Sequence, residues 1–187
     1  RLRGDKGVRE LVEAAGRLAE TRPRLVVLLA GAPDPANPSS LGAAELARMD
    51  GGPVRVLGRQ GDVRKLLAMA DVFTNPSYRD GLPRSNLEAA AMGLPLVTTD
   101  VRGCRETVID GQSGLVVPPG DAAALAHAIG TLLDDPGRRR RMGAAGRALV
   151  LSRFTVAQVA DDLAALYHAL VSAAAGVGRA GGSHGGG

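Results

Sequence analysis

Aromatic residues, cysteine and lysine are all scarce in this sequence, and each shortage excludes something. Phe, Tyr and Trp make up only 2% of the 187 residues, so the core must be built from Ala, Val and Leu. The single cysteine, Cys104, excludes an internal disulfide framework and fits a reducing compartment. No apolar run approaches the ~18 residues that a membrane-spanning helix needs, and no signal peptide is recognised.

The charge is basic, with a formal net value of +4, and it comes almost entirely from arginine because Lys6 and Lys65 are the only lysines. This balance suits anionic small molecules, anionic lipid surfaces or nucleic acid, and does not choose among them. The arginine run at 138–141 has no aromatic neighbours for base stacking, which favours a solvated helix face over nucleic-acid binding. No His, Cys and Asp cluster has metal-ligand spacing, so we expect no metal.

Short apolar runs of strand length alternate with segments of helical periodicity along residues 6–120. The expected strands are 24–31, 54–58, 71–77, 95–100 and 114–120, and helices are expected at 6–20, 61–70 and 85–93. This alternation predicts an α/β fold with a doubly wound, Rossmann-like, mostly parallel sheet. From Asp121 the pattern is helical only. We expect one domain over residues 1–172 and a disordered, glycine-rich tail over 173–187.

The segment "YRDGLPRSN" follows the strand expected at 71–77, and ligands of doubly wound sheets bind beyond the carboxyl ends of strands. A helix that starts near Ser85 and Asn86 would offer free backbone N–H groups to a phosphate. Asp80 precedes this anion site and Glu88 falls in the helix's expected first turn. Carboxylates accept hydrogen bonds from sugar hydroxyls. The alternative is that Asp80 starts a turn and Glu88 favours the helix dipole, and spacing does not separate the two.

A second candidate is the opening "RLRGDKG", where Arg1 and Lys6 flank a glycine turn before a helix. Two cations at a helix N-terminus would clamp a diphosphate, one through its fork and one as a point charge. An ordinary solvated loop explains the same residues, and the local sequence favours it.

Three segments, "RLRGDKG", "RDGLPRSNLEAAAMGLPLVTTD" and "VRGCRETVIDGQSGLVVPPGD", occur in the order of a family's motifs. Together they resemble the C-terminal, nucleotide-sugar-binding half of a retaining GT-B glycosyltransferase of the "glycosyl transferases group 1" family. The resemblance runs from Arg1 to about Leu170. It is strongest to bacterial polysaccharide and lipid-linked oligosaccharide transferases that use UDP-sugars.

The resemblance implies a role for each matching position. Arg1 and Lys6 would neutralise the donor's diphosphate and assist its departure, and Asp80 would hold hydroxyls of the transferred sugar, so these three are the expected catalytic residues. Glu88 would bind the ribose hydroxyls. The family's first acid is usually glutamate, and the shorter Asp80 implies a retuned sugar site. Further donor-binding positions are the amides around Gly81, Leu82 and Asn86 for the phosphates, and Arg59 and Gln60 for the base.

The implied activity is transfer of a hexosyl or N-acetylhexosaminyl group, with retention, from a UDP-sugar or another nucleotide diphosphate-sugar to a saccharide or lipid-linked acceptor. No cofactor and no covalent nucleophile are expected. The implied partner is an N-terminal acceptor domain of the same protein, in the cytoplasm or at the inner face of the membrane, with no nucleic acid. Because the chain begins inside a motif, we expect it to be a fragment that binds donor but turns over little or nothing.

Other functions stay open on this architecture: a nucleotide-sugar epimerase, a phosphorylase, or a non-catalytic nucleotide-binding module. A phosphorylase would need a pyridoxal lysine, and neither lysine stands in such a context. Dinucleotide-binding domains and nucleoside triphosphatases are disfavoured, because no strand is followed by G-x-G-x-x-G and no G-K-[ST] occurs.

Overall fold

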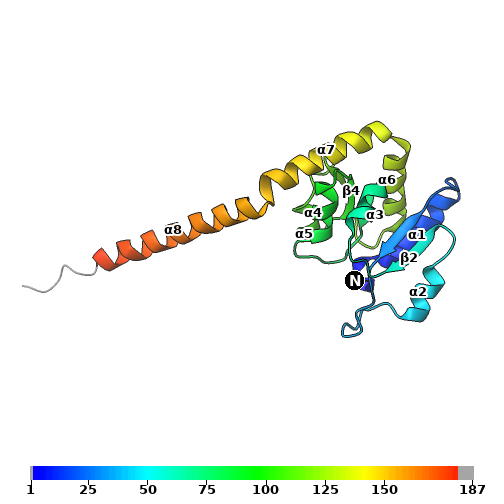
Figure 1. Ribbon diagram of the computed structural model, residues 1–187, viewed down its shortest axis with the longest axis horizontal. Coiled ribbons are helices and arrows are strands. Elements are labelled where there is room, and N and C mark those ends of the chain that lie inside the picture. Colours follow the sequence, from blue (N-terminus) through cyan, green and yellow to red (C-terminus); the bar gives the residue numbers. More distant parts are fainter. Residues whose placement is uncertain (1, 181–187) are drawn as a thin grey trace, which may run out of the picture. The chain divides into compact units, whose positions relative to one another are not determined.

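The computed structural model describes the backbone of residues 2–180 and the side chains of residues 2–172 (Figure 1). The chain forms two compact units, Arg1–Val150 and Leu151–Gly187. The first unit holds every strand of the described residues and all of the predicted site residues.

Five short strands, all paired in parallel, form the first unit's sheets. β1 (Val27–Ala30) pairs with β2 (Val54–Gly58), and β3 (Phe73–Asn75) pairs with β4 (Leu96–Thr99), which in turn pairs with β5 (Gly114–Val117). Each strand lies inside the segment where the sequence predicted one, and all four residues of β4 are buried, as expected for a covered parallel strand. The predicted α/β, Rossmann-like class is confirmed. Its strands are hydrogen-bonded as one two-stranded sheet, β1-β2, and one three-stranded sheet, β3-β4-β5.

Helices connect the strands as the periodicity predicted. α1 (Val8–Ala19), α3 (Arg64–Met69), α4 (Arg84–Ala91) and α6 (Ala122–Asp134) match predicted segments. α6 begins where the helical pattern was expected to start, and Asp121 is its N-cap, because its carboxylate accepts a hydrogen bond from the Ala124 amide at 2.8 Å. Two short helices, α2 (Ala43–Met49) and α5 (Arg102–Arg105), were not predicted; α5 spans only four residues, which is about one turn.

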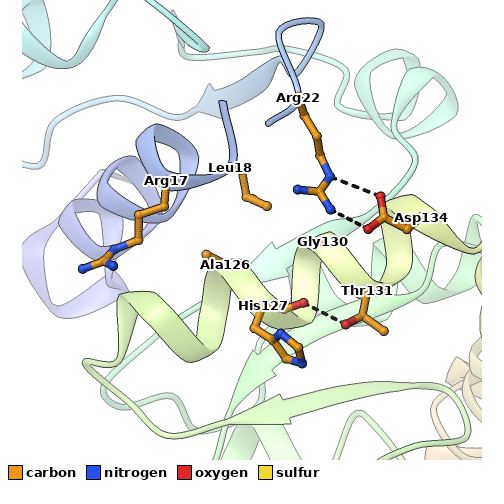
Figure 2. Close-up of a pocket in the computed structure, with 8 residues that line it drawn as sticks. All are labelled: Arg17, Leu18, Arg22, Ala126, His127, Gly130, Thr131 and Asp134. Carbon is orange, nitrogen blue, oxygen red and sulfur yellow. Dashed lines mark hydrogen bonds and ion pairs between the residues drawn. The ribbon is translucent and has the colours of Figure 1, made fainter. Parts of the chain in front are cut away.

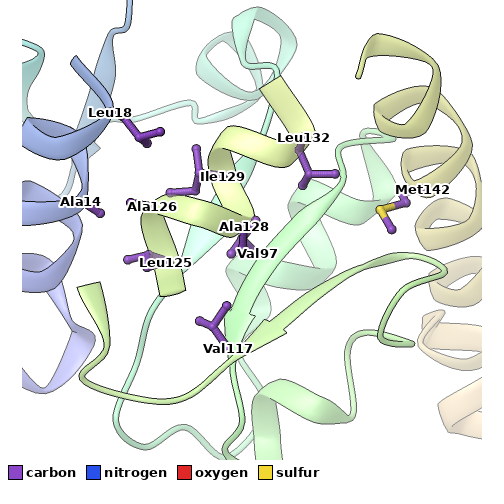
Figure 3. Close-up of a cluster of buried hydrophobic side chains, with 10 residues drawn as sticks. All are labelled: Ala14, Leu18, Val97, Val117, Leu125, Ala126, Ala128, Ile129, Leu132 and Met142. Carbon is purple, nitrogen blue, oxygen red and sulfur yellow. The ribbon is translucent and has the colours of Figure 1, made fainter. Parts of the chain in front are cut away.

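Two clusters of buried apolar side chains stabilise the first unit, and α1 contributes to both. Figure 3 shows one cluster, in which Leu125, Ile129 and Leu132 of α6 pack with other side chains that include Ala14 and Leu18 of α1. The other cluster joins a second face of α1 to β1, α2 and β2, with members Leu2, Val8, Ala15, Leu29, Leu41, Leu46 and Val54. α1 therefore packs on two of its faces. This packing fixes the position of the loop that precedes α1 and carries Lys6.

α7 (Pro136–Arg153) and α8 (Val156–Ala180) complete the chain's helices. Five apolar side chains at helical spacing along α8 are exposed by 50–87%: Val156, Val159, Leu163, Leu166 and Leu170. The first compact unit ends at Val150, short of the domain predicted for 1–172, and α8 continues past 172 to Ala180. Residues 181–187 of the predicted tail lie outside the described residues, and the domain boundary stays a prediction. No described helix combines the length and the hydropathy required to cross a membrane.

Candidate functional site

A tight glycine turn positions Lys6. Gly4–Lys6 form one turn of 3-10 helix, η1, and Gly7, the N-cap of α1, lies in the left-handed region with φ of 66°. A Cβ on Gly7 would lie 2.0 Å from the carbonyl oxygen of Pro76, which follows β3. Only glycine permits both this backbone conformation and this approach, so the turn lies directly against the loop that carries Asp80.

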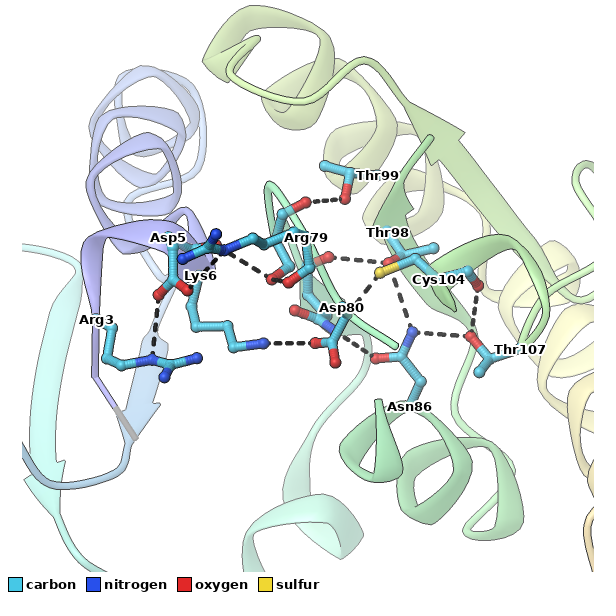
Figure 4. Close-up of polar contacts among 12 residues, drawn as sticks. Arg3, Asp5, Lys6, Arg79, Asp80, Asn86, Thr98, Thr99, Cys104 and Thr107 are labelled. Atoms are coloured by element: carbon cyan, nitrogen blue, oxygen red, sulfur yellow. Dashed lines mark hydrogen bonds and ion pairs between the residues drawn. The ribbon is translucent and has the colours of Figure 1, made fainter. Parts of the chain in front are cut away.

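Asp5 ties this turn to the loop after β3, as Figure 4 shows in part. Its carbonyl oxygen accepts hydrogen bonds from the Ser77 hydroxyl at 3.2 Å and the Tyr78 amide at 3.0 Å. Its carboxylate lies 3.1 Å from the Arg3 guanidinium and 3.7 Å from that of Arg79. One residue thus fixes two segments that are more than 70 positions apart in the sequence, since Ser77 is 72 residues from Asp5.

Lys6 and Asp80, both predicted to contact the donor, are in direct contact. The Lys6 ammonium donates to the Asp80 carboxylate at 2.6 Å, across 74 residues of sequence (Figure 4). Their side chains are only 26% and 18% exposed, so the pair is partly shielded from water. The structure therefore brings one predicted cation and one predicted acid to the same place, beyond the carboxyl end of β3.

Open backbone donors lie next to Asp80. In the described part of the chain, the N–H groups of Gly81, Leu82, Arg84 and Ser85 have no hydrogen-bond acceptor. Their residues are all exposed. Unpaired N–H groups before and within the first turn of a helix form an anion site, and the macrodipole adds to it.

The predicted position of Glu88 in the first turn of α4 was wrong. The helix begins at Arg84 with Pro83 at its N-cap, so no acidic residue lies in the first turn and Glu88 falls in the second. The Glu88 side chain is exposed, and its carboxylate has no partner among the described residues. It remains free to accept hydrogen bonds from a ligand.

Asn86 lies beneath the open N–H groups, fully buried. Its amide N–H donates to the Pro83 carbonyl at 3.0 Å, so this N–H is already satisfied. Its side-chain oxygen accepts from Asn75 at 2.9 Å, and its side-chain nitrogen donates to Thr107 at 2.9 Å, with Thr98 at 3.5 Å. We call Asn75, Asn86, Thr98 and Thr107 the buried polar cluster, which joins β3, α4, β4 and the residues after α5. Figure 4 labels three of its members, Asn86, Thr98 and Thr107.

α5 supports the loop that carries Asp80 from the other side. A Cβ on Gly103 would lie 2.2 Å from the carbonyl oxygens of both Asp80 and Gly81, so only glycine allows this contact. Thr107, a member of the buried polar cluster, donates through its hydroxyl to the Cys104 carbonyl at 2.7 Å. The cluster and the loop are consequently connected through α5.

Cys104 is fully buried behind the site. Burial raises the pKa of its thiol above the ordinary value, and the hydroxyls of Thr98 and Thr99 act in the opposite direction. A buried thiol with a raised pKa is a poor nucleophile, which agrees with the absence of a predicted catalytic role.

Arg59 and Gln60 are not brought into contact with Lys6 or Asp80. Arg59 is exposed after β2, and the Gln60 side chain donates to the Leu57 carbonyl at 2.7 Å within its own loop. Arg1 lies outside the described residues. Within the described ranges, no three His, Cys, Asp or Glu side chains gather closely enough to hold a metal ion.

A groove of about 260 Å³ lies between α1 and α6, away from the predicted residues (Figure 2). Its two guanidinium groups already have partners, since Arg22 pairs with Asp134 and Arg17 pairs with Glu13. A second groove, of about 560 Å³, is bordered by the ion pair of Arg105 and Asp100 at 3.2 Å. Neither groove contains a predicted site residue.

Sequence reasoning missed the residues that hold the site together. Arg3 and Asp5 stand inside the quoted motif "RLRGDKG", where the local sequence does not distinguish them from other loop residues. The buried polar cluster carries one usable signal: polar residues end the β3 and β4 segments, "FTN" and "LVTT", where buried strands are otherwise apolar.

The chain matches the family described as "Glycosyl transferases group 1" over residues 1–149. It is 36% identical to alpha-maltose-1-phosphate synthase of Mycolicibacterium smegmatis, over 89% of this chain and 46% of that protein. It is also 36% identical to N,N'-diacetylbacillosaminyl-diphospho-undecaprenol alpha-1,3-N-acetylgalactosaminyltransferase of Campylobacter jejuni, over 82% of this chain and 39% of that protein.

Among solved structures, the chain resembles Anabaena Alr3699/HepE in complex with UDP, with a TM-score of 0.80 and 26% identity. That likeness covers 90% of this chain and 47% of the other. The chain therefore spans less than half the length of each of these three proteins.

Proposed function

Since the chain belongs to the glycosyl transferases group 1 family, we propose that it is the donor-binding half of a retaining glycosyltransferase. The donor is a nucleotide diphosphate-sugar, by preference a UDP-sugar, and the transferred group is a hexosyl or N-acetylhexosaminyl unit. One observation carries the proposal: Lys6 and Asp80 meet at 2.6 Å beside the exposed, unpaired N–H groups of Gly81, Leu82, Arg84 and Ser85. Such a site suits a diphosphate attached to a group that bears hydroxyls.

In this proposal the diphosphate lies against the open N–H groups, with Lys6 and Arg1 as its cations. Negative charge grows on the diphosphate as the sugar–oxygen bond breaks, and fixed donors that face this charge stabilise the transition state more than the ground state. These donors are preorganised here, because Gly7 and Asp5 hold the Lys6 turn against the loop of Asp80. The chain itself supplies this stabilisation, and we propose that transfer needs no metal.

Asp80 would accept hydrogen bonds from the hydroxyls of the transferred sugar, and Glu88 from those of the ribose. The carboxylate of Glu88, which is exposed and has no partner among the described residues, supports this role. We propose Arg59 and Gln60 for the base. Asn86 would not contact the donor, because its backbone N–H and its side chain already make hydrogen bonds within the protein. Its role would be to hold α4 in place.

The names of the relatives support the choice of donor and acceptor. HepE was solved with UDP, and another HepE structure holds UDP-glucose. The Campylobacter enzyme transfers N-acetylgalactosamine to a diphospho-undecaprenol acceptor, as its name states. We therefore propose a saccharide or lipid-linked acceptor, bound by an N-terminal domain, in the cytoplasm or at the inner face of the membrane. The present chain alone would bind donor with little or no turnover.

Isothermal titration calorimetry against UDP, GDP and ADP, with their glucose conjugates and NAD, tests this proposal. We expect saturable binding of UDP-glucose. Lys6→Ala removes a charge-assisted hydrogen bond of about 1.5–3 kcal/mol and should weaken binding about tenfold or more. Glu88→Ala should also weaken the binding of UDP-glucose, because it removes the acceptor proposed for the ribose hydroxyls. Lys65→Ala and Glu20→Ala, which remove exposed residues of the same types elsewhere, are the matched controls.

Three results would contradict the proposal. No saturable binding across the panel would favour a non-catalytic scaffold. Tighter binding of NAD than of any diphosphate would favour a dinucleotide-binding module. Equal losses in Lys6→Ala and Lys65→Ala would show that the site lies elsewhere.

A further inference from the structure

Among the described residues, the side chains of Lys6 and Asp80 pair only with each other. Throughout the described residues the Lys6 ammonium has no other acceptor, and the Asp80 carboxylate has no other side-chain donor. Among the described residues, the neighbouring cations Arg3 and Arg79 both lie against Asp5. Whatever binds Lys6 must therefore separate it from Asp80 or share it.

Separation of the pair carries a cost that depends on the ligand. The Asp80 side chain is only 18% exposed, so water replaces the lost ammonium incompletely. A partly buried carboxylate without a donor is destabilising, and a second negative charge beside it adds repulsion. A ligand that offers new donors to Asp80 removes this cost.

A free nucleoside diphosphate and its sugar conjugate differ at this point. The terminal phosphate of the free diphosphate carries an additional negative charge and has no hydroxyl donors. In the conjugate, the sugar masks that charge as an ester and presents O–H groups to Asp80. Only the conjugate can therefore donate new hydrogen bonds to the Asp80 carboxylate when Lys6 leaves it.

We infer that the Lys6–Asp80 pair makes Asp80 a specificity-determining residue, which selects nucleoside diphosphate-sugars against free nucleoside diphosphates. The inference rests on the proposed function and deepens it. In the complete enzyme it would weaken retention of the diphosphate product, since loss of the sugar returns Lys6 to Asp80.

Calorimetry of the wild-type chain and Asp80→Asn with UDP and UDP-glucose tests the inference. Asparagine keeps the size and an acceptor oxygen but removes the charge. An ion pair at a partly exposed site is worth up to about 1 kcal/mol, and the repulsion from the terminal phosphate adds to it, so UDP should bind about three- to tenfold tighter to Asp80→Asn. The affinity for UDP-glucose should increase less, because the sugar hydroxyls lose the charged carboxylate that accepts their hydrogen bonds. The preference for the conjugate should therefore fall.

Asp134→Asn is the matched control, because Asp134 is also ion-paired, with Arg22, and lies at the far end of α6. It should leave both affinities unchanged, and thermal unfolding should show both variants folded. Unchanged or weaker UDP binding by Asp80→Asn would overturn the inference, since Asp80 would then only orient Lys6. If wild type and Asp80→Asn both fail to bind UDP and UDP-glucose, the proposed function itself fails.

Discussion

Replacement of Asn86 by alanine removes the central member of the buried polar cluster. Asn86 is fully buried and makes two side-chain hydrogen bonds of 2.9 Å, one with Asn75 and one with Thr107. Truncation of Asn86 leaves the side-chain nitrogen of Asn75 with the Cys104 sulfur, at 3.9 Å, as its acceptor. Both the fold and the position of the Asp80 loop depend on this cluster.

The two lost hydrogen bonds contribute about 1 kcal/mol each, and the stranded Asn75 donor costs about 1–2 kcal/mol more. The expected loss in the free energy of unfolding is therefore about 3–4 kcal/mol. For a domain of about 150 residues, this corresponds to a fall in Tm of roughly 10 °C. The loss is large because the site is fully buried and water cannot replace the missing partner.

Urea unfolding measures the global loss, and two further assays locate it. Cys104 is the only cysteine and is buried against the cluster, so its reaction rate with a thiol reagent reports local opening. UDP affinity reports the donor site. Leu132→Ala is the stability-matched control, because Leu132 is fully buried in the apolar cluster along α6 and its truncation costs about 2–5 kcal/mol.

At a temperature where all variants are folded, Asn86→Ala should label faster at Cys104 and bind UDP at least about fivefold more weakly than wild type, a loss of about 1 kcal/mol. Leu132→Ala should bind UDP normally. A loss below about 1 kcal/mol of stability in Asn86→Ala would refute the hydrogen-bond accounting. Equal UDP affinities in Asn86→Ala and Leu132→Ala would refute the link between the cluster and the site.

Gly7→Ala should lose about 2–3 kcal/mol in urea unfolding and weaken UDP binding, because its Cβ would lie 2.0 Å from the Pro76 carbonyl at a φ of 66°. Gly16→Ala, in the same helix with open space around its Cβ, should instead stabilise by about 0.5–1 kcal/mol, and the reverse ranking would contradict the packing described. The phenol of Tyr78 donates to Glu10 at 2.7 Å, and this hydrogen bond raises the pKa of Tyr78 above its usual value. The hydrogen bond contributes fully to the free energy of unfolding below pH ~10, the ordinary pKa of tyrosine. This contribution is lost as the pH rises through the raised pKa of Tyr78 in the folded state. Glu10→Gln should bring the phenolate absorbance to lower pH, and an unshifted titration would show that the bond is absent in solution.

Strand positions were predictable because buried parallel strands show as continuous apolar runs between turn residues. "PLVTTD" and "GLVVPPG" are of this kind, and β4 and β5 lie within them. The meeting of Lys6 and Asp80 followed from the resemblance to a family and not from spacing, since 74 residues separate the two. For the same reason nothing in the local pattern indicated Asp5, whose contacts with Ser77, Tyr78 and Arg79 are made through the folded chain.

The start of α4 was misplaced because serine and asparagine are favoured helix caps. In the structure, the carbonyl of Pro83 accepts from the amides of Asn86 and Leu87, and Asn86 turns inward instead of capping. A polar residue at a helix start has the same sequence pattern whether it caps, binds a ligand or joins a buried cluster. Only burial separates these roles.

The position of the diphosphate in a crystal structure of this chain with UDP-glucose would test the central claim most directly. We predict phosphate oxygens within hydrogen-bond distance of the Lys6 ammonium and of the Gly81 and Leu82 amides, with Asp80 turned from Lys6 to the sugar. A diphosphate bound elsewhere, with the Lys6–Asp80 contact intact, would contradict it.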